Sequence, residues 1–382
     1  MNKVLILINI TGLIIGISYG LHGPILPVFA KNIIGATYSE LGLIGLTNFI
    51  PYMFIPLFVG ILLDRFNNGY LLSLGVAINS ASIYLLSIAQ SVPEIMGFRI
   101  MTGIAHAFFW PPCEAIISNQ SSEQNRVKHI SWFTMFFVIG FMAGPLLGTV
   151  LLEGLDTTYR ILFQIAAFIL AAAIITSLLA SQKSVKKHHE RFSFSSIKEM
   201  KRFPEVIILL IFCTSSFGII LTIYPAFLND NGMSASDILL LYFIFGISRV
   251  ASLALVGKFA RRTSQTLIAG TIAVSAGLAL SVVADSIITF GIALVLMGFG
   301  FSIFFPLTLE IILSKTRKGI SGKIIGAYET IFGMGWAIGP TIGGPITQSF
   351  GNETPYVVFC IIGIGVSLFA INARKKLEPQ RI

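Results

Sequence analysis

Five residues between positions 99 and 114 carry most of the chemistry of a long apolar stretch. Arg99, Gly103, His106, Trp110 and Glu114 follow one another at spacings of 4, 3, 4 and 4 residues. On an α-helix these spacings keep the side chains within an arc of roughly 80° along roughly 22 Å of helix. Facing lipid would be too costly for a guanidinium, an imidazole and a carboxylate. We therefore expect this stripe to face protein or a water-filled space.

Other ionisable residues inside apolar stretches are candidates for the same reason. His and Glu can take up and release protons near neutral pH when partly buried. Arg stays protonated, but it can bind an anion or lower the pKa of a neighbouring carboxylate. A structural ion pair, or a charge at a membrane edge, is the alternative for each of them. The further candidates for proton coupling or substrate binding are His22, Arg249, Glu310 and Glu329.

The sequence gives no support for a metal site, an organic cofactor or an enzyme active site. Cys113, Cys213 and Cys360 lie far apart and form no CxxC pair, so we expect buried packing thiols. HExxH, GxSxG, P-loop and Asp-rich motifs are absent. A membrane-embedded enzyme acting on lipid is therefore only a remote alternative.

Composition indicates which elements must position these side chains. Of the 382 residues, 55% are hydrophobic and only 11% are charged, whereas soluble domains average about 25% charged residues. Such a chain can only present its outer surface to lipid. Twelve apolar stretches of about the 20 residues needed to span a bilayer predict an all-α membrane protein. They lie at 4–30, 40–63, 70–89, 93–117, 129–152, 159–181, 205–228, 235–257, 265–283, 287–313, 321–348 and 355–373.

Basic residues predict the orientation of the spans. With a cytoplasmic N-terminus, every Lys and Arg lies in or near a cytoplasmic segment except Lys31, Arg99, Arg160 and Arg249. This is the positive-inside pattern, so both termini are expected in the cytoplasm of a multi-pass cell-membrane protein. The net charge of +9 is then a matter of topology, and a nucleic-acid partner is not expected. The first apolar run is too long for a signal peptide and is expected to be retained as a span.

The chain repeats itself around a central basic segment. Residues 140–148 read GFMAGPLLG and residues 335–343 read GWAIGPTIG, at an offset of 195. The division predicts a first six-helix bundle at 1–181, a cytoplasmic linker at 182–204 and a second bundle with a short tail at 205–382. Six-helix repeats are typical of secondary transporters, whose substrate site lies between the repeats.

Four motifs together resemble the major facilitator superfamily over the whole chain. GILLDRFNNGY (60–70) is similar to that family's signature between helices 2 and 3, and GPLLG (144–148) to its helix 5 antiporter signature. YGLHGPILPVF (19–29) resembles helix 1 of the twelve-helix drug:proton antiporters, and Arg99-x-x-x-Gly103 resembles the helix 4 signature. The resemblance implies two pseudo-symmetric six-helix bundles that work by alternating access.

The resemblance also implies residues that control conformation. Gly60, Asp64 and Arg65 would form a latch at the cytoplasmic end of helix 2, although Asn67, Asn68 and Gly69 replace the family's Gly-Arg-Lys; an ordinary charged turn is the alternative. The glycines of helices 5 and 11 offer small surfaces for close helix packing, which we expect to join the two halves and restrict leak. Their positions are Gly140, Gly144, Pro145 and Gly148, with Gly335, Gly339, Pro340 and Gly343.

The leading hypothesis is a secondary transporter, acting as a monomer, that exports small amphipathic organic molecules in exchange for protons. The proton gradient would supply the energy, and the partners would be the substrate and the lipid bilayer. An uptake symporter or facilitator for a sugar or organic anion remains open, since Arg99 and Arg249 would suit a negative charge. A membrane sensor or scaffold is a more distant alternative.

Overall fold

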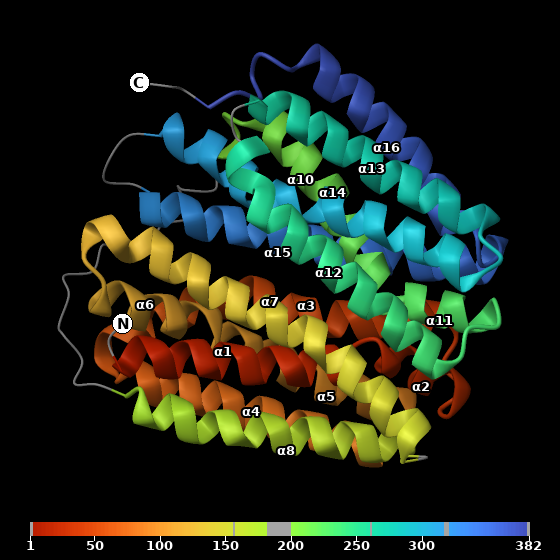
Figure 1. Ribbon diagram of the computed structural model, residues 1–382, viewed down its shortest axis with the longest axis horizontal. Coiled ribbons are helices and arrows are strands. Elements are labelled where there is room, and N and C mark those ends of the chain that lie inside the picture. Colours follow the sequence, from red (N-terminus) through yellow and green to blue (C-terminus); the bar gives the residue numbers. More distant parts are fainter. Residues whose placement is uncertain (1–2, 156, 182–199, 260–261, 317–320, 380–382) are drawn as a thin grey trace. The chain divides into compact units, whose positions relative to one another are not determined.

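A computed structural model describes residues 3–155, 157–181, 200–259, 262–316 and 321–379, in which all regular structure is α-helical (Figure 1). Most of the predicted linker therefore lies outside the described residues. The first half contains α1 (Lys3–His22), α2 (Ile25–Asn32), α3 (Tyr38–Arg65), α4 (Asn68–Ile88), α5 (Val92–Ala107), α6 (Trp110–Gln120), α7 (Glu123–Gly154) and α8 (Tyr159–Leu179). The second half contains α10 (Pro204–Thr222), α11 (Tyr224–Asp230), α12 (Ala235–Phe259), α13 (Thr263–Val283), α14 (Ile287–Ser314), α15 (Ser321–Phe350) and α16 (Thr354–Asn372).

These helices confirm the predicted all-α membrane protein. Each of the twelve predicted spans coincides with one helix or with two helices in succession. Among the described residues, 9 helical segments are long and apolar enough to cross a membrane by length and composition. Large apolar side chains on their outer faces are exposed, as Phe168 of α8 and Ile361 of α16 illustrate. Lipid is the environment in which such exposed surface is stable.

The predicted single helix at 93–117 is wrong, because the chain forms a tight turn at Phe108–Phe109. Pro111 and Pro112 have no N–H to donate to the carbonyls four residues earlier. The N–H of Phe108 and that of Phe109 instead donate to carbonyls three residues back, Ala105 and His106, at 3.0 and 3.1 Å. This 3₁₀-like turn separates α5 from α6.

Two other predicted spans are also divided, again near prolines. The span at 4–30 is interrupted at Gly23–Pro24, which separates α1 from α2, and the span at 205–228 is interrupted at Ile223, ahead of Pro225. A proline in a helix interior removes one backbone hydrogen bond and crowds the preceding turn. The first break is important for the site, because it makes His22 the last residue of α1.

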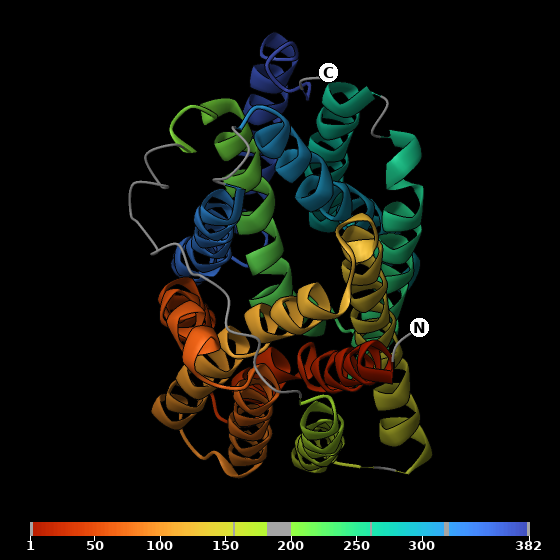
Figure 2. The same cartoon turned by 90° about the vertical axis from the view of Figure 1, so that its left-hand side faces the viewer.

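The chain forms two compact units. Unit 1 contains residues 1–36, 47–190 and 233–243, and unit 2 contains residues 37–46, 191–232 and 244–382. In unit 1, α1 packs against both α7 and α8, and α4 packs against α8 (Figure 1). In unit 2, α13 packs between α14 and α16, and α10 packs against α15 (Figure 2).

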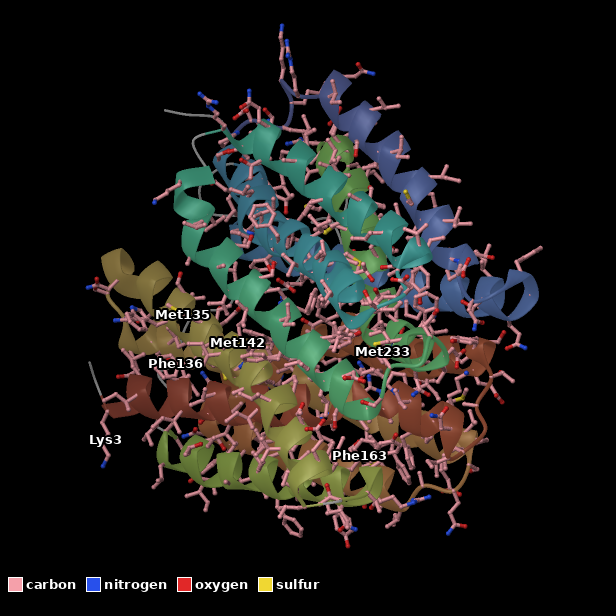
Figure 3. All side chains as sticks on the ribbon, turned by 45° about the vertical axis from the view of Figure 1, so that its right-hand side comes forward. Lys3, Met135, Phe136, Met142, Phe163 and Met233 are labelled. Carbon is pink, nitrogen blue, oxygen red and sulfur yellow. The ribbon has the colours of Figure 1, made fainter. Side chains whose placement is uncertain are left out.

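Side chains of mixed size fill and cover unit 1. Figure 3 shows Met135, Phe136 and Met142 along α7, and Lys3 at the start of α1. Phe163 of α8 is fully buried, and its ring meets the ring of Phe29 edge-on at 5.1 Å. The contact between Phe29 and Phe163 joins α2 to α8, next to the polar residues described below.

Candidate functional site

A phenol ring in α1 brings two histidines of unit 1 together. The Tyr19 ring meets the His106 ring of α5 edge-on, with centroids 4.8 Å apart, and lies 5.9 Å from the ring of His22. Tyr52 of α3 approaches His106 from another direction, at 6.3 Å. The prediction placed both histidines among the candidates, and the structure gathers them around one residue that the sequence reasoning missed.

The tautomer of His22 follows from the end of α1. Its Nδ1 lies 2.6 Å from the carbonyl oxygen of Ser18, and a carbonyl can only accept a hydrogen bond. Nδ1 therefore carries the hydrogen, and Nε2 is left as the atom that takes up or releases a proton. His22 is 3% exposed, so its imidazole is shielded from bulk solvent within unit 1.

An amide and a guanidinium complete this group, which we call the Tyr19 cluster (Tyr19, His22, Tyr52, Asn79, Arg99 and His106). The Asn79 side-chain amide of α4 donates to the Tyr19 hydroxyl at 2.6 Å. The charge of Arg99 acts on Tyr19 and on both histidines. Arg99 is partly buried, and its Nε atom has no hydrogen-bond partner among the described residues. Asn79, like Tyr19, was absent from the predicted site; a polar residue inside an apolar span was the available signal.

The predicted stripe from Arg99 to Glu114 does not continue across the break between α5 and α6. Trp110 begins α6 and packs against Phe133 and Phe137 of α7, at 5.4 and 5.2 Å between ring centroids. Phe137 in turn contacts Tyr19 at 6.0 Å, so Trp110 borders the cluster through that ring. Glu114 is exposed on α6, beyond the break, so it does not share one continuous helix with His106.

Unit 2 has its own buried cation, which is surrounded by aromatic rings. The guanidinium carbon of Arg249 in α12 lies within 5.2–5.6 Å of the ring centroids of Phe217, Phe245 and Phe301. Such cation–π contacts stabilise a positive charge in an apolar setting. Trp336 stacks on Phe217 at 5.7 Å. These rings were not predicted, because a phenylalanine in an apolar span carries no distinguishing signal.

The two remaining acidic candidates lie elsewhere in unit 2. Glu310 is exposed near the end of α14, and Glu329 of α15 is partly buried next to Tyr328. The Tyr328 hydroxyl and the Thr308 hydroxyl are hydrogen-bonded at 2.8 Å. The proposed roles of Glu310 and Glu329 stay predictions.

Two of the helix 5 glycines pack on α1 inside unit 1, and the expected role of all these glycines in joining the two halves stays a prediction. A Cβ on Gly140 would come 2.2 Å from the carbonyl oxygen of Leu13, and one on Gly144 would come 2.3 Å from that of Ile17. Both partners belong to α1. Gly148 faces Leu21 of α1 and a leucine of the 233–243 segment that unit 1 also contains.

Unit 2 repeats the same packing at the predicted offset. A Cβ on Gly335 or Gly339 would meet Thr214 and Ser215 of α10, and Gly343 faces Ile219 and Ile223. Pro145 and Pro340 lie beside Gly20 and Gly218 in the two units. A second pair agrees as well: Gly103 packs on the backbone of Asn48, and Gly298 on that of Phe245. The internal repeat is therefore present in the packing contacts as well as in the sequence.

The predicted latch is only partly described. Gly60 and Asp64 lie in the last turns of α3, and the Asp64 side chain is outside the described part; Arg65 ends the helix and is exposed. The Asn67 side chain accepts from the Gly69 N–H at 2.9 Å and from the Ser181 hydroxyl at 2.8 Å. The residues that depart from the family pattern thus cap α4 and attach it to the end of α8.

Comparisons with known proteins agree with this architecture. The sequence profile of the Major Facilitator Superfamily matches residues 8–340 and 263–381. The chain is 24% identical over 395 residues to the quinolone resistance protein NorA of Staphylococcus aureus, covering 100% of both proteins. It is 25% identical to multidrug resistance protein 1 of Bacillus subtilis over 329 residues, covering 84% of this chain and 83% of that protein.

Solved structures share the fold at low sequence identity. A variant of the nucleoside transporter NupG matches with a TM-score of 0.83 at 13% identity, over 97% of this chain and 99% of that one. A bacterial homologue of the human lysosomal transporter Spinster matches with a TM-score of 0.78 at 14% identity, over 98% and 97%. Helices at each of the predicted spans, repeated packing and a family match over the whole chain lead to one conclusion. This chain belongs to the Major Facilitator Superfamily and is a multi-pass membrane transporter, not an enzyme.

Proposed function

We propose that this transporter exports small amphipathic organic molecules in exchange for protons. Full-length similarity to a quinolone resistance protein and similarity to a multidrug resistance protein support export. The observation that carries proton exchange is the pair of imidazoles, His22 and His106, which share the ring of Tyr19 inside the membrane-spanning part of unit 1.

Exchange requires that a proton and a substrate weaken each other's binding, since coupling between two ligands is reciprocal. Protonation of either histidine would put a second positive charge in the Tyr19 cluster beside Arg99. The other groups facing the imidazoles are the phenols of Tyr19 and Tyr52 and, through Tyr19, the amide of Asn79. None of these described groups carries a negative charge, so we expect a protonated cluster to disfavour a substrate that carries an amine.

Transport into inverted membrane vesicles tests the proposal. With an acidic vesicle interior, the wild-type chain should accumulate norfloxacin or ethidium, and nigericin, which collapses the pH gradient, should abolish this. His22→Gln and His106→Gln should each reduce accumulation at least tenfold. His129→Gln is the matched control, because His129 is bonded to Ser121 at 2.6 Å outside the cluster. Accumulation that survives the loss of the gradient would refute proton exchange.

Uptake of an organic anion is a second candidate, favoured by the buried cations Arg99 and Arg249. Right-side-out vesicles separate the two functions. Proton-driven accumulation of benzoate there, with no norfloxacin accumulation in inverted vesicles, would favour uptake.

We also propose that the transporter acts as a monomer and that both of its termini lie in the cytoplasm. The distribution of Lys and Arg supports this orientation. Lys375 is exposed beyond α16. A cysteine placed there should react with a membrane-impermeant maleimide in inverted vesicles and stay protected in intact cells. Labelling in intact cells would reverse the orientation.

A further inference from the structure

Three of the buried polar atoms in unit 1 that have no hydrogen-bond partner among the described residues lie on α3, α4 and α5. They are Oδ1 of Asn48 in α3, Oδ1 of Asn79 in α4 and Nε of Arg99 in α5. Asn48 is 1% and Asn79 is 3% exposed. Most buried polar groups in native proteins are bonded, because an unsatisfied one is destabilising, and more so beside a charge. Three such atoms on neighbouring helices indicate a place where a polar ligand completes the bonding.

The three residues converge on one region of unit 1. Gly103 of α5 packs directly on the backbone of Asn48, and Arg99 lies one helical turn before Gly103. Asn79 is bonded to the Tyr19 hydroxyl, on which the charge of Arg99 also acts. In either orientation of the Asn79 amide, the Tyr19 hydroxyl forms a hydrogen bond with one of its two polar atoms. The other polar atom is then available to a ligand.

We propose that Arg99, with Asn79, forms a subsite for the carboxylate of a substrate. A guanidinium presents its N–H groups as a planar fork that matches a carboxylate, and the pairing is charge-assisted. A carboxylate would satisfy the Nε atom of Arg99, and it supplies the negative charge that the Tyr19 cluster does not provide from its own side chains. This inference rests on the proposed exporter and names the chemical class of its substrate.

The direction of coupling adds a second requirement. A purely anionic substrate would favour protonation of His22 and His106, and so would travel with the proton. A zwitterion avoids this, because its ammonium group repels a protonated imidazole while its carboxylate stays on Arg99. The rings of Tyr19, Tyr52 and Trp110 offer cation–π surfaces for that ammonium group. The preferred substrate is therefore an aromatic amino-carboxylate.

Arg249 of unit 2 is the matched comparison. Its guanidinium is also buried, but it already lies against three phenylalanine rings. Replacing it should change the aromatic cluster of unit 2 and leave carboxylate recognition in unit 1 intact.

Equilibrium binding to the purified full chain tests the subsite with a matched pair of probes, norfloxacin and its methyl ester. The acid should bind roughly tenfold to a hundredfold more tightly than the ester, as expected for one charge-assisted pairing. Arg99→Gln should bring the ratio close to one, and Arg99→Lys should retain part of it. Arg249→Gln should keep the ratio of the wild type.

Three outcomes would overturn the inference: no measurable binding of norfloxacin, equal affinities for acid and ester, or a ratio that survives Arg99→Gln. Measurable binding of the ester shows that a variant is folded. If Arg99→Gln does not fold, Asn79→Asp is the second variant, because a negative charge placed in the Tyr19 cluster should lower the preference for the acid at least tenfold. Proton-driven transport of ethidium without an acid preference would refute only the subsite, whereas absence of proton-driven transport of both probes would refute the exporter.

Discussion

Adding a single methyl group at Gly144 should separate α1 from α7 and destabilise unit 1. A Cβ at this position would lie 2.3 Å from the carbonyl oxygen of Ile17 and 2.6 Å from the N atom of Leu21. Both atoms belong to the backbone, so no side-chain rotation relieves the overlap. Ordinary Cβ contacts begin at 3.4 Å, and α1 would have to move by 3.4 − 2.3 Å, or about 1 Å.

Gly97 provides the matched control. It lies inside α5, and a Cβ there meets nothing within 4 Å. Replacing a helical glycine by alanine without a clash stabilises a helix by up to about 1 kcal/mol. Overpacking of a close-packed interior costs about 1–3 kcal/mol. Both substitutions gain the same helix propensity, so the difference between them reports the clash. Gly144→Ala should therefore be less stable than Gly97→Ala by about 1–3 kcal/mol.

The buried thiols allow unfolding of unit 1 to be measured separately. Cys113 lies in unit 1 and is 0% exposed, whereas Cys213 lies in unit 2. In a Cys213→Ala, Cys360→Ala background, a thiol-reactive dye reports only exposure of Cys113 during heating in detergent. The Gly144→Ala protein should label at a lower temperature than the background, and Gly97→Ala at an equal or higher one.

Equal midpoints for the two alanine variants would contradict the close packing of α1 on α7. The repeat gives an internal check, because a Cβ on Gly339 would come 2.0 Å from the carbonyl oxygen of Ser215 in α10. Gly339→Ala should destabilise unit 2 in the same way, with Cys213 as its reporter.

Three further predictions concern polar contacts at the ends of helices. Tyr38→Phe removes a 2.7 Å hydrogen bond to the Asp230 carboxylate within unit 2. The free energy of unfolding should fall by about 1.5–3 kcal/mol, measured by labelling of the buried Cys213 thiol. An unchanged unfolding midpoint would show that the bond does not stabilise unit 2. Glu378→Gln weakens the cap that this carboxylate provides for the Ser264 N–H at 3.1 Å, at the start of α13. The free energy of unfolding should fall by about 0.5–2 kcal/mol in the same assay. Glu378→Ala should destabilise the protein at least as much. Asp64→Asn should slow norfloxacin export at normal expression if the predicted latch operates, whereas unaltered export would make this an ordinary turn.

The arrangement of spans could be predicted from the sequence because it depends on local properties. Length and hydrophobicity locate each crossing, and the repeated GP segments at 140–148 and 335–343 reveal the internal symmetry. Arg99 and His106 were also recognisable, since an ionisable side chain inside a membrane span is costly and usually functional. These inferences need no knowledge of which helices are neighbours.

The helix breaks were missed although their cause is in the sequence. Pro111 was noticed as part of the repeat, but a proline inside a span can either kink or divide a helix. Whether the backbone continues depends on how the released carbonyls are satisfied. At this break the N–H groups of Phe108 and Phe109 donate to the carbonyls of Ala105 and His106 in a turn of tighter pitch, and α6 begins at Trp110.

The sequence by itself determined the number of spans, the repeat, the family and the buried charges, because hydrophobicity, spacing and motif similarity are all read along one chain. Only the tertiary structure decided that Gly144 packs on α1, and that Tyr19 brings His22, Asn79 and His106 together. The physical reason is that each residue type indicates a kind of contact. A small residue in a span indicates that another helix packs closely there, and a polar residue indicates that it has a hydrogen-bond partner. The identity of that partner depends on which helices are adjacent in space.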